Sequence, residues 1–124
     1  MNLIIGGAWQ VKLDFAKETW HYEDEDIFTC RDDQIDFSRP CIDRIQEFTW
    51  ACVQSGTDPV AYFEEHRSEW ENSTLICRDI FCGVVPLDAD RRRWRHCTGV
   101  LCQYLSKHAD RVSRIFCGLE QRLK

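Results

Sequence analysis

The sequence predicts a mainly α protein: a small disulfide-stapled bundle of four to five helices with an extended or β-like N-terminal arm. Three observations favour this class. Eight cysteines in a chain of 124 residues are typical of a disulfide framework. Apolar residues recur at helical spacing through most of the chain after residue 37. Residues 8–15 instead alternate between apolar and polar side chains, as a half-buried strand does.

The length predicts one domain, in which residues 1–36 form the arm and an acidic loop and residues 37–124 form the disulfide-linked helical bundle. Four side chains are expected on the buried side of the arm: Trp9, Val11, Leu13 and Phe15. The segment 21–36 is acidic, has few apolar residues and carries Cys30, which predicts a loop.

Capping residues and apolar stripes divide the bundle into helices. Asp58 stands before a proline suited to a first helical turn, so this pair is expected to start a helix, and Asp88 and Asp90 are expected to cap a long periodic segment. The expected helical segments are 41–52, 59–70, 73–82 and 89–105, with a further apolar stripe over 112–123 that continues the last one.

The cysteines form a comb along the second half of the chain, with gaps of four and fourteen residues between Cys77 and Cys117. We expect all eight to pair as disulfides: Cys30, Cys41, Cys52, Cys77, Cys82, Cys97, Cys102 and Cys117. Gly83 and Pro86 can turn the chain between Cys82 and Cys97, which favours that bridge. A zinc site and buried reduced thiols are the two alternatives that this spacing leaves open.

The charge is unevenly distributed, because residues 1–90 hold 7 Lys and Arg against 19 Asp and Glu, whereas residues 91–124 hold 9 against 2. The basic half begins with a cluster that predicts an anion-binding surface for a sulfated glycan, an acidic headgroup or an acidic protein. Its members are Arg91, Arg92, Arg93, Trp94 and Arg95. The net charge of −5 argues against nucleic acid as a partner.

The sequence contains no recognised catalytic or cofactor motif. The four histidines lie in no nucleophile or zinc-hydrolase pattern. Gly6 and Gly7 alone are too little for a phosphate-cradling loop. We therefore predict that the protein is not an enzyme and uses neither a cofactor nor a metal.

These observations together predict a secreted cysteine-rich binding protein, such as a receptor ligand, a toxin-like or effector protein, or a small ectodomain. Its predicted partner is a receptor or another extracellular protein. Asn72 begins a triplet that predicts N-glycosylation. No segment has membrane-spanning length. The sequence shows no signal peptide, which predicts a mature form with an added Met1. A small secreted hydrolase with a histidine–carboxylate site and a carrier of an apolar ligand are the alternatives.

Overall fold

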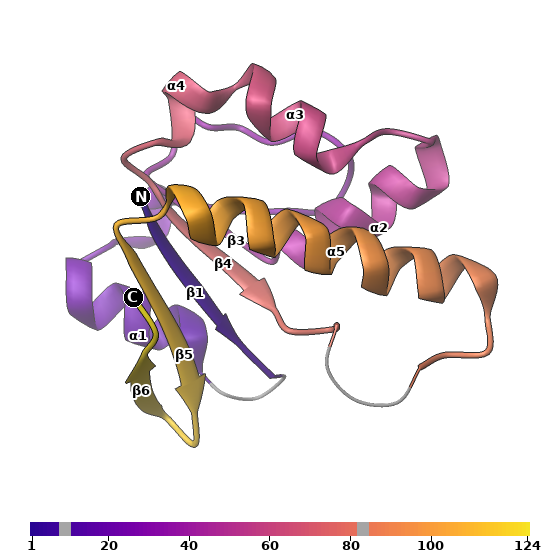
Figure 1. Cartoon of the computed structure of the whole chain (residues 1–124). Helices are drawn as coiled ribbons and strands as arrows, with labels where there is room; N and C mark the ends of the chain where they lie inside the picture. Colours follow the sequence, from indigo (N-terminus) through magenta and orange to yellow (C-terminus); the bar gives the residue numbers. More distant parts are fainter. Residues whose placement is uncertain (8–10, 82–84) are drawn as a thin grey trace.

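The computed structural model describes residues 1–7, 11–81 and 85–124, and it is an α/β fold around a six-stranded sheet (Figure 1). The predicted mainly α bundle is therefore wrong. In chain order the elements are β1 (Asn2–Gly6), α1 (Lys12–Trp20), the 3-10 turn η1 (Asp24–Asp26), β2 (Ile27–Thr29), β3 (Cys41–Asp43), α2 (Ile45–Ser55), α3 (Pro59–Glu65), α4 (Arg67–Trp70), β4 (Thr74–Arg78), α5 (Ala89–His108), β5 (Arg111–Phe116) and β6 (Leu119–Arg122).

The sheet has the strand order β2-β3-β4-β1-β5-β6. The first five strands in this order are parallel, and β6 pairs with β5 in antiparallel orientation. Strand β1 is central, because Leu3 lies opposite Leu75 of β4 on one side and opposite Val112 of β5 on the other. The segment predicted as an arm thus begins with the strand around which the sheet is built.

Two hydrophobic cores lie on opposite faces of the sheet, and neighbouring strand residues supply them alternately. Leu3 and Leu75 belong to the larger core, which is covered by α2, α3 and α5. Ile4 and Ile76 belong to the smaller core, which is covered by α1. Burial on both faces explains why the middle residues of the two strands, 3–5 in β1 and 75–77 in β4, are apolar without alternation.

The N-terminal half departs from the prediction at two places. Residues 12–15 were expected in a strand but form the first turn of α1, while residues 8–10 of the same predicted strand lie outside the described residues. The helix expected over 41–52 begins instead as strand β3, and its helical part starts at Ile45. In both segments the spacing of the apolar residues fits the period of a helix as well as that of a strand, so contacts with the neighbouring strands decide the conformation.

The C-terminal half departs in the same way. The helix expected over 73–82 is strand β4, whose first four residues are fully buried between β1 and β3. The stripe over 112–123 is the β5–β6 hairpin, not a continuation of α5. Cys117 and Gly118 both have positive φ, as the two central residues of a tight hairpin turn require.

Two predicted helix starts are confirmed. Asp58 caps α3 by accepting hydrogen bonds from the backbone N–H groups of Val60 and Ala61, at 3.0 and 3.4 Å. Asp88 caps α5 through the N–H groups of Asp90 and Arg91, at 2.8 and 3.3 Å. Side-chain capping is a local interaction, which explains why it could be recognised without knowledge of the fold.

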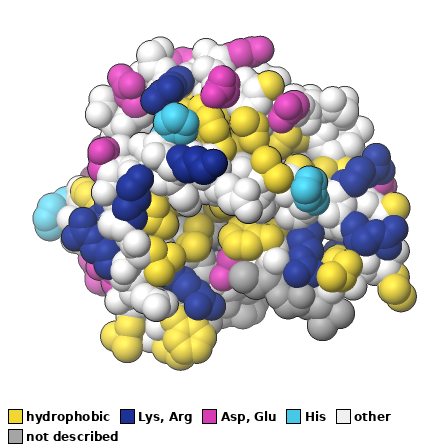
Figure 2. Space-filling model, in the orientation of Figure 1, with side chains coloured by type: hydrophobic (Ala, Val, Ile, Leu, Met, Phe, Trp, Pro, Cys, Tyr) yellow, Lys and Arg dark blue, Asp and Glu magenta, His cyan; other side chains and the backbone are white. Residues whose placement is uncertain are grey.

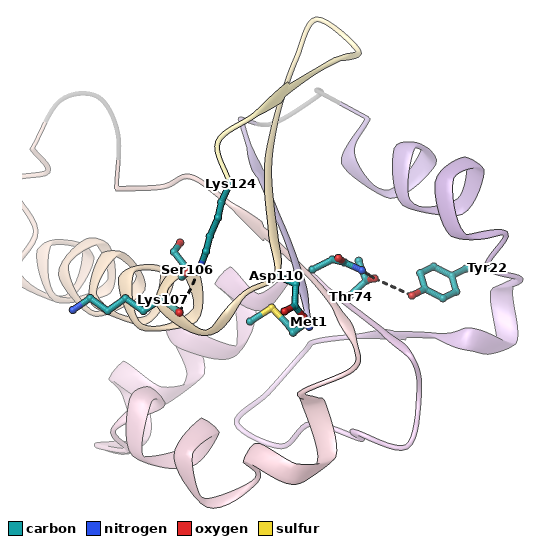
Figure 3. A network of polar contacts seen from close by, with 8 residues as sticks. Met1, Tyr22, Thr74, Ser106, Lys107, Asp110 and Lys124 are labelled. Carbon is teal, nitrogen blue, oxygen red and sulfur yellow. Dashed lines mark hydrogen bonds and ion pairs between the residues drawn. The ribbon is translucent and has the colours of Figure 1, made fainter.

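Polar contacts join the elements at the amino ends of β1 and β4 (Figure 3). The Tyr22 and Thr74 hydroxyls lie 2.8 Å apart, and the Met1 amine lies 2.6 Å from an Asp110 carboxylate oxygen. Lys124 Nζ donates to the carbonyls of Ser106 and Lys107 in the last turn of α5. This edge of the sheet is therefore held by direct contacts between protein groups.

Candidate functional site

The candidate site lies at the carboxyl ends of β1 and β4, which are adjacent and parallel. Strand β1 is followed by α1 on one face of the sheet, whereas β4 is followed by α5 on the opposite face (Figure 1). The helices that follow these two adjacent strands therefore lie on opposite faces of the sheet, which defines a crevice at the strand ends. Open α/β sheets bind their ligands at such a switch point.

An open pocket of about 360 Å³ occupies this edge of the sheet. Three segments far apart in the sequence supply its lining, one after each of β1, β3 and β4. The lining residues are Val11, Lys12, Leu13, Asp14, Asp43, Arg44, Gln46 and Arg78. The volume lies at the lower end of the range for small-molecule sites.

Lys12 is the first residue of α1, and its position brings a positive charge into the crevice. Its Nζ donates a 2.8 Å hydrogen bond to the carbonyl oxygen of Gly7, so the side chain folds back toward the carboxyl end of β1. Burial lowers the pKa of Lys12, and the nearby carboxylates of Asp43 and Asp79 act in the opposite direction. The ammonium group is thus partly dehydrated and close to the strand ends.

Val11 and Arg44 precede α1 and α2, and both have left-handed backbone conformations, with φ of 55° and 59°. A β-branched residue such as valine rarely adopts this conformation. Neither residue caps its helix with a side chain. Two helices therefore begin at the pocket with uncapped first turns, where the helix dipole favours an anion.

The remaining polar lining is fixed by hydrogen bonds. Asp43 Oδ1 accepts the backbone N–H of Arg44 at 2.8 Å, and burial raises the pKa of this carboxyl group. Gln46 is buried, and its Oε1 accepts the backbone N–H of Arg78 at 3.0 Å. Among the described residues the guanidinium of Arg78 has no hydrogen-bond or ion-pair partner, so it is available to a ligand.

The pocket therefore joins three cationic side chains to two uncapped helix starts. Two carboxylates, those of Asp14 and Asp43, also line it, so the pocket charge is only moderately positive. Within the described part of the chain, no three His, Cys, Asp or Glu side chains are grouped as metal ligands. Chemically, this arrangement suits an anion of several charges, such as a phosphate ester.

Three arginines of the predicted basic cluster make separate contacts with nearby groups. Arg92 donates to the carbonyls of Pro86 and Leu87, Arg93 pairs with Asp90, and Arg95 Nε donates to the carbonyl of Phe81 at 3.1 Å. These contacts hold the first turns of α5.

Trp94 turns toward α2, where its Nε1 donates to the carbonyl of Gln46 at 2.8 Å and its ring packs against Trp50. Arg91 is exposed. Figure 2 shows basic side chains spread over the viewed face of the molecule in several places. The predicted anion-binding role of the cluster stays a prediction.

The predicted disulfides are wrong for the described part of the chain, where seven cysteines form no disulfide: Cys30, Cys41, Cys52, Cys77, Cys97, Cys102 and Cys117. The eighth, Cys82, lies outside the described residues. A hydrogen bond with the Cys102 thiol, together with burial, raises the pKa of Cys77. Five of the seven are buried, and they act as small apolar side chains of the two cores.

Asn72 lies in the turn that precedes β4 and is exposed. The two residues that complete its triplet, Ser73 and Thr74, are buried. Glycosylation at Asn72 stays a prediction.

The pocket residues were missed in the sequence, although a signal is present. Residues 6–13, GGAWQVKL, match two of the four defined positions of the phosphate-loop pattern GxxxxGK[ST], because Val11 replaces the second glycine and Leu13 replaces the hydroxyl residue. Because that pattern requires a preceding strand and a following helix, the position of β1 and α1 is what makes the resemblance meaningful.

The comparisons with known proteins give no family: the sequence matches no protein family model, and no curated protein matches it. Among the described residues, no helix is both long and apolar enough to cross a membrane. The function must therefore be argued from the geometry of the pocket.

Proposed function

We propose that this protein binds a small phosphorylated ligand, of the nucleotide or diphosphate class, in the pocket at the carboxyl edge of its sheet. One observation carries the proposal: Lys12 begins the helix after the central strand, at the switch point where Arg44 and Arg78 line the same pocket. Lysine and arginine are the side chains that proteins use most for phosphate recognition.

Three physical arguments support this ligand class. The first turns of α1 and α2 offer backbone N–H groups that no side chain caps. The Lys12 ammonium group can exchange its bond to the Gly7 carbonyl for a bond to a phosphate oxygen without loss of a buried partner. Gln46, held between Arg78 and Trp94, keeps the pocket wall rigid, which lowers the entropic cost of binding.

The test is isothermal titration calorimetry with ADP and with inorganic pyrophosphate at low salt, on the wild-type protein and two variants. Lys12→Ala removes the pocket cation, whereas Lys17→Ala removes an exposed lysine of the same helix that pairs with Asp24. A hydrogen bond to a charged group contributes about 1.5–3 kcal/mol, so we expect Lys12→Ala to weaken binding about 10- to 150-fold. Lys17→Ala should bind within twofold of the wild type.

Two results would contradict the proposal. The first is that neither ADP nor pyrophosphate binds the wild-type protein. The second is that Lys12→Ala and Lys17→Ala weaken binding equally. The second result would mean that the affinity comes from lysine charge anywhere along α1 and not from the pocket.

A second candidate function is protein binding, as the sequence predicted, and the β5–β6 hairpin is the observation that favours it. Phe116, Leu119 and Leu123 are 58%, 73% and 54% exposed, and hydrophobic side chains are visible at this end of the molecule in Figure 2. Exposed apolar patches commonly mark contact surfaces. Sedimentation velocity of the wild type and a Phe116→Ser/Leu119→Ser variant would test contacts between copies of the chain.

The predicted secretion of the protein and its predicted lack of enzymatic activity stay predictions. The prediction of secretion depended on disulfides, and the described cysteines form none.

A further inference from the structure

The proposed phosphate site differs from phosphate loops in the way that it can neutralise its ligand. In those loops the residue after the lysine is serine or threonine, and its hydroxyl binds the magnesium ion that accompanies the phosphates. Here that residue is Leu13, whose side chain packs against the smaller core with Ile4 and Ala16. The start of α1 therefore offers no side-chain oxygen where magnesium would need one.

The other oxygen donors near the pocket do not replace that ligand. Asp43 Oδ1 is already bonded to the Arg44 N–H, and the carboxylate of Asp79 lies 4.0 Å from Arg114 Nε. Asp14 lines the pocket as well, but it is exposed in the first turn of α1. Magnesium requires close to octahedral oxygen coordination, and within the described residues no three His, Cys, Asp or Glu side chains are grouped as metal ligands. The donor set does not fit the metal.

Two arginines stand where additional positive charge is needed. Arg78 ends β4 and its guanidinium is unpaired within the described chain, and Arg44 begins α2 with its side chain 55% exposed and 3.5 Å from Glu47. A guanidinium can donate two parallel hydrogen bonds to one phosphate. Together with Lys12, these side chains can balance the charge of a diphosphate without a metal.

We propose that Arg44 and Arg78 take the place of a divalent cation, so that the pocket binds a diphosphate group without magnesium. This inference rests on the proposed function and specifies its ligand as the metal-free diphosphate. It follows that magnesium weakens binding, because a magnesium–diphosphate complex carries less negative charge for the arginines to contact.

The experiment is calorimetric titration of inorganic pyrophosphate into the full chain, in two buffers of equal ionic strength. One buffer is freed of metals over a chelating resin, because a soluble polyanionic chelator would compete for the pocket. The other contains excess magnesium chloride. We expect pyrophosphate to bind more tightly in the metal-free buffer than in magnesium, and equal affinity in the two buffers would contradict the inference.

Variants identify the groups responsible. In the metal-free buffer Arg78→Ala should weaken binding at least about fivefold. Arg78→Lys keeps the positive charge but cannot donate two parallel hydrogen bonds, so its affinity should be intermediate. Arg31→Ala is the control, because Arg31 is exposed and does not line the pocket. The Arg78 side chain makes no hydrogen bond or ion pair with the described residues, so its replacement should not affect folding, which thermal denaturation can verify.

The outcomes separate the two proposals. Binding that occurs only with magnesium, or that is unchanged in Arg78→Ala, overturns the metal-free inference and leaves the phosphate site intact. Absence of pyrophosphate and ADP binding in both buffers overturns the phosphate site itself, and the inference with it. Binding in the metal-free buffer that depends on Arg78 and not on Arg31 supports both.

Discussion

Replacing Val11 by glycine and by alanine tests whether the backbone before α1 is strained. Val11 has φ of 55° and ψ of 40°, a left-handed conformation that costs a residue with a Cβ atom about 1–2 kcal/mol. Its side chain is 49% exposed. Both variants therefore lose the same valine methyl groups, and the comparison between them isolates the conformational preference at this position.

The expected difference follows from two opposing contributions. Glycine avoids the left-handed cost of about 1–2 kcal/mol. It also gives the unfolded chain more conformational entropy than alanine does, which lowers the stability of the folded protein by about 0.4–1 kcal/mol. Val11→Gly should therefore be about 0.5–1 kcal/mol more stable than Val11→Ala. At an ordinary helix position the order is reversed, with glycine about 0.5–1 kcal/mol less stable.

The assay is thermal and urea denaturation followed by circular dichroism. For a chain of this length the difference corresponds to a Tm that is about 3 °C higher for the glycine variant. Equal m-values in urea would show that both variants unfold from equally compact states. If the glycine variant melts below the alanine variant, residue 11 is not left-handed, and the strained start of α1 is refuted.

Three further predictions follow from the described contacts. Burial raises the pKa of Asp43, so its negative charge lowers the stability of the folded protein once the pH exceeds the pKa of this group in the unfolded chain. Asp43→Asn should therefore be more stable than the wild type at pH 7 in urea denaturation. This advantage should disappear below about pH 4, where the wild-type carboxyl group is protonated in both states. Asp88→Ala removes the cap of α5 and should cost about 1 kcal/mol in the same assay, whereas an unchanged stability would contradict the cap. Burial raises the pKa of Cys41 and of Cys52 to about 12, so iodoacetamide at pH 8 should alkylate neither thiol in the native protein. In denaturant both thiols should be alkylated without a reductant. If alkylation required a reductant, the disulfide hypothesis would be restored.

The parts of the fold that could be predicted are those that local interactions determine. The cap at Asp88 and a periodic stripe long enough for several turns identified α5, which extends over 20 residues. The aspartate–proline pair at Asp58 identified α3 in the same way. In both helices the deciding interactions lie within a few residues, so the sequence contains them.

The sheet could not be predicted, because its strands are defined by neighbours distant in the sequence. Strand β4 has five residues, of which Leu75, Ile76 and Cys77 form an apolar run, and its partners are β1 and β3. Such a run is as compatible with a buried helical turn as with a buried strand. Only the hairpin turn at Cys117 and Gly118 carried a local signal, and the helical spacing of Val112 and Ile115 obscured it.

The disulfides were wrongly predicted because the high number of cysteines was taken to indicate pairing. Cys41, Cys77 and Cys102 occupy buried positions on strands and a helix, where a small apolar side chain fits. The same misinterpretation obscured the candidate site, since an arm stapled to a bundle leaves no strand before Lys12. Without that strand, GGAWQVKL lacks the context that a phosphate loop requires.

The two ends of the sheet differ in a way that favours a ligand at one of them. At the amino end, polar groups are matched by other protein groups, as in the contact between Tyr22 and Thr74. At the carboxyl end, α1 and α2 begin without side-chain caps, Val11 is left-handed, and Arg78 has no partner in the described chain. Strain and unpaired charge each reduce stability, and they persist at functional sites where they contribute to binding. An anion in the pocket would satisfy the helix starts and the guanidinium together, so one ligand accounts for both features.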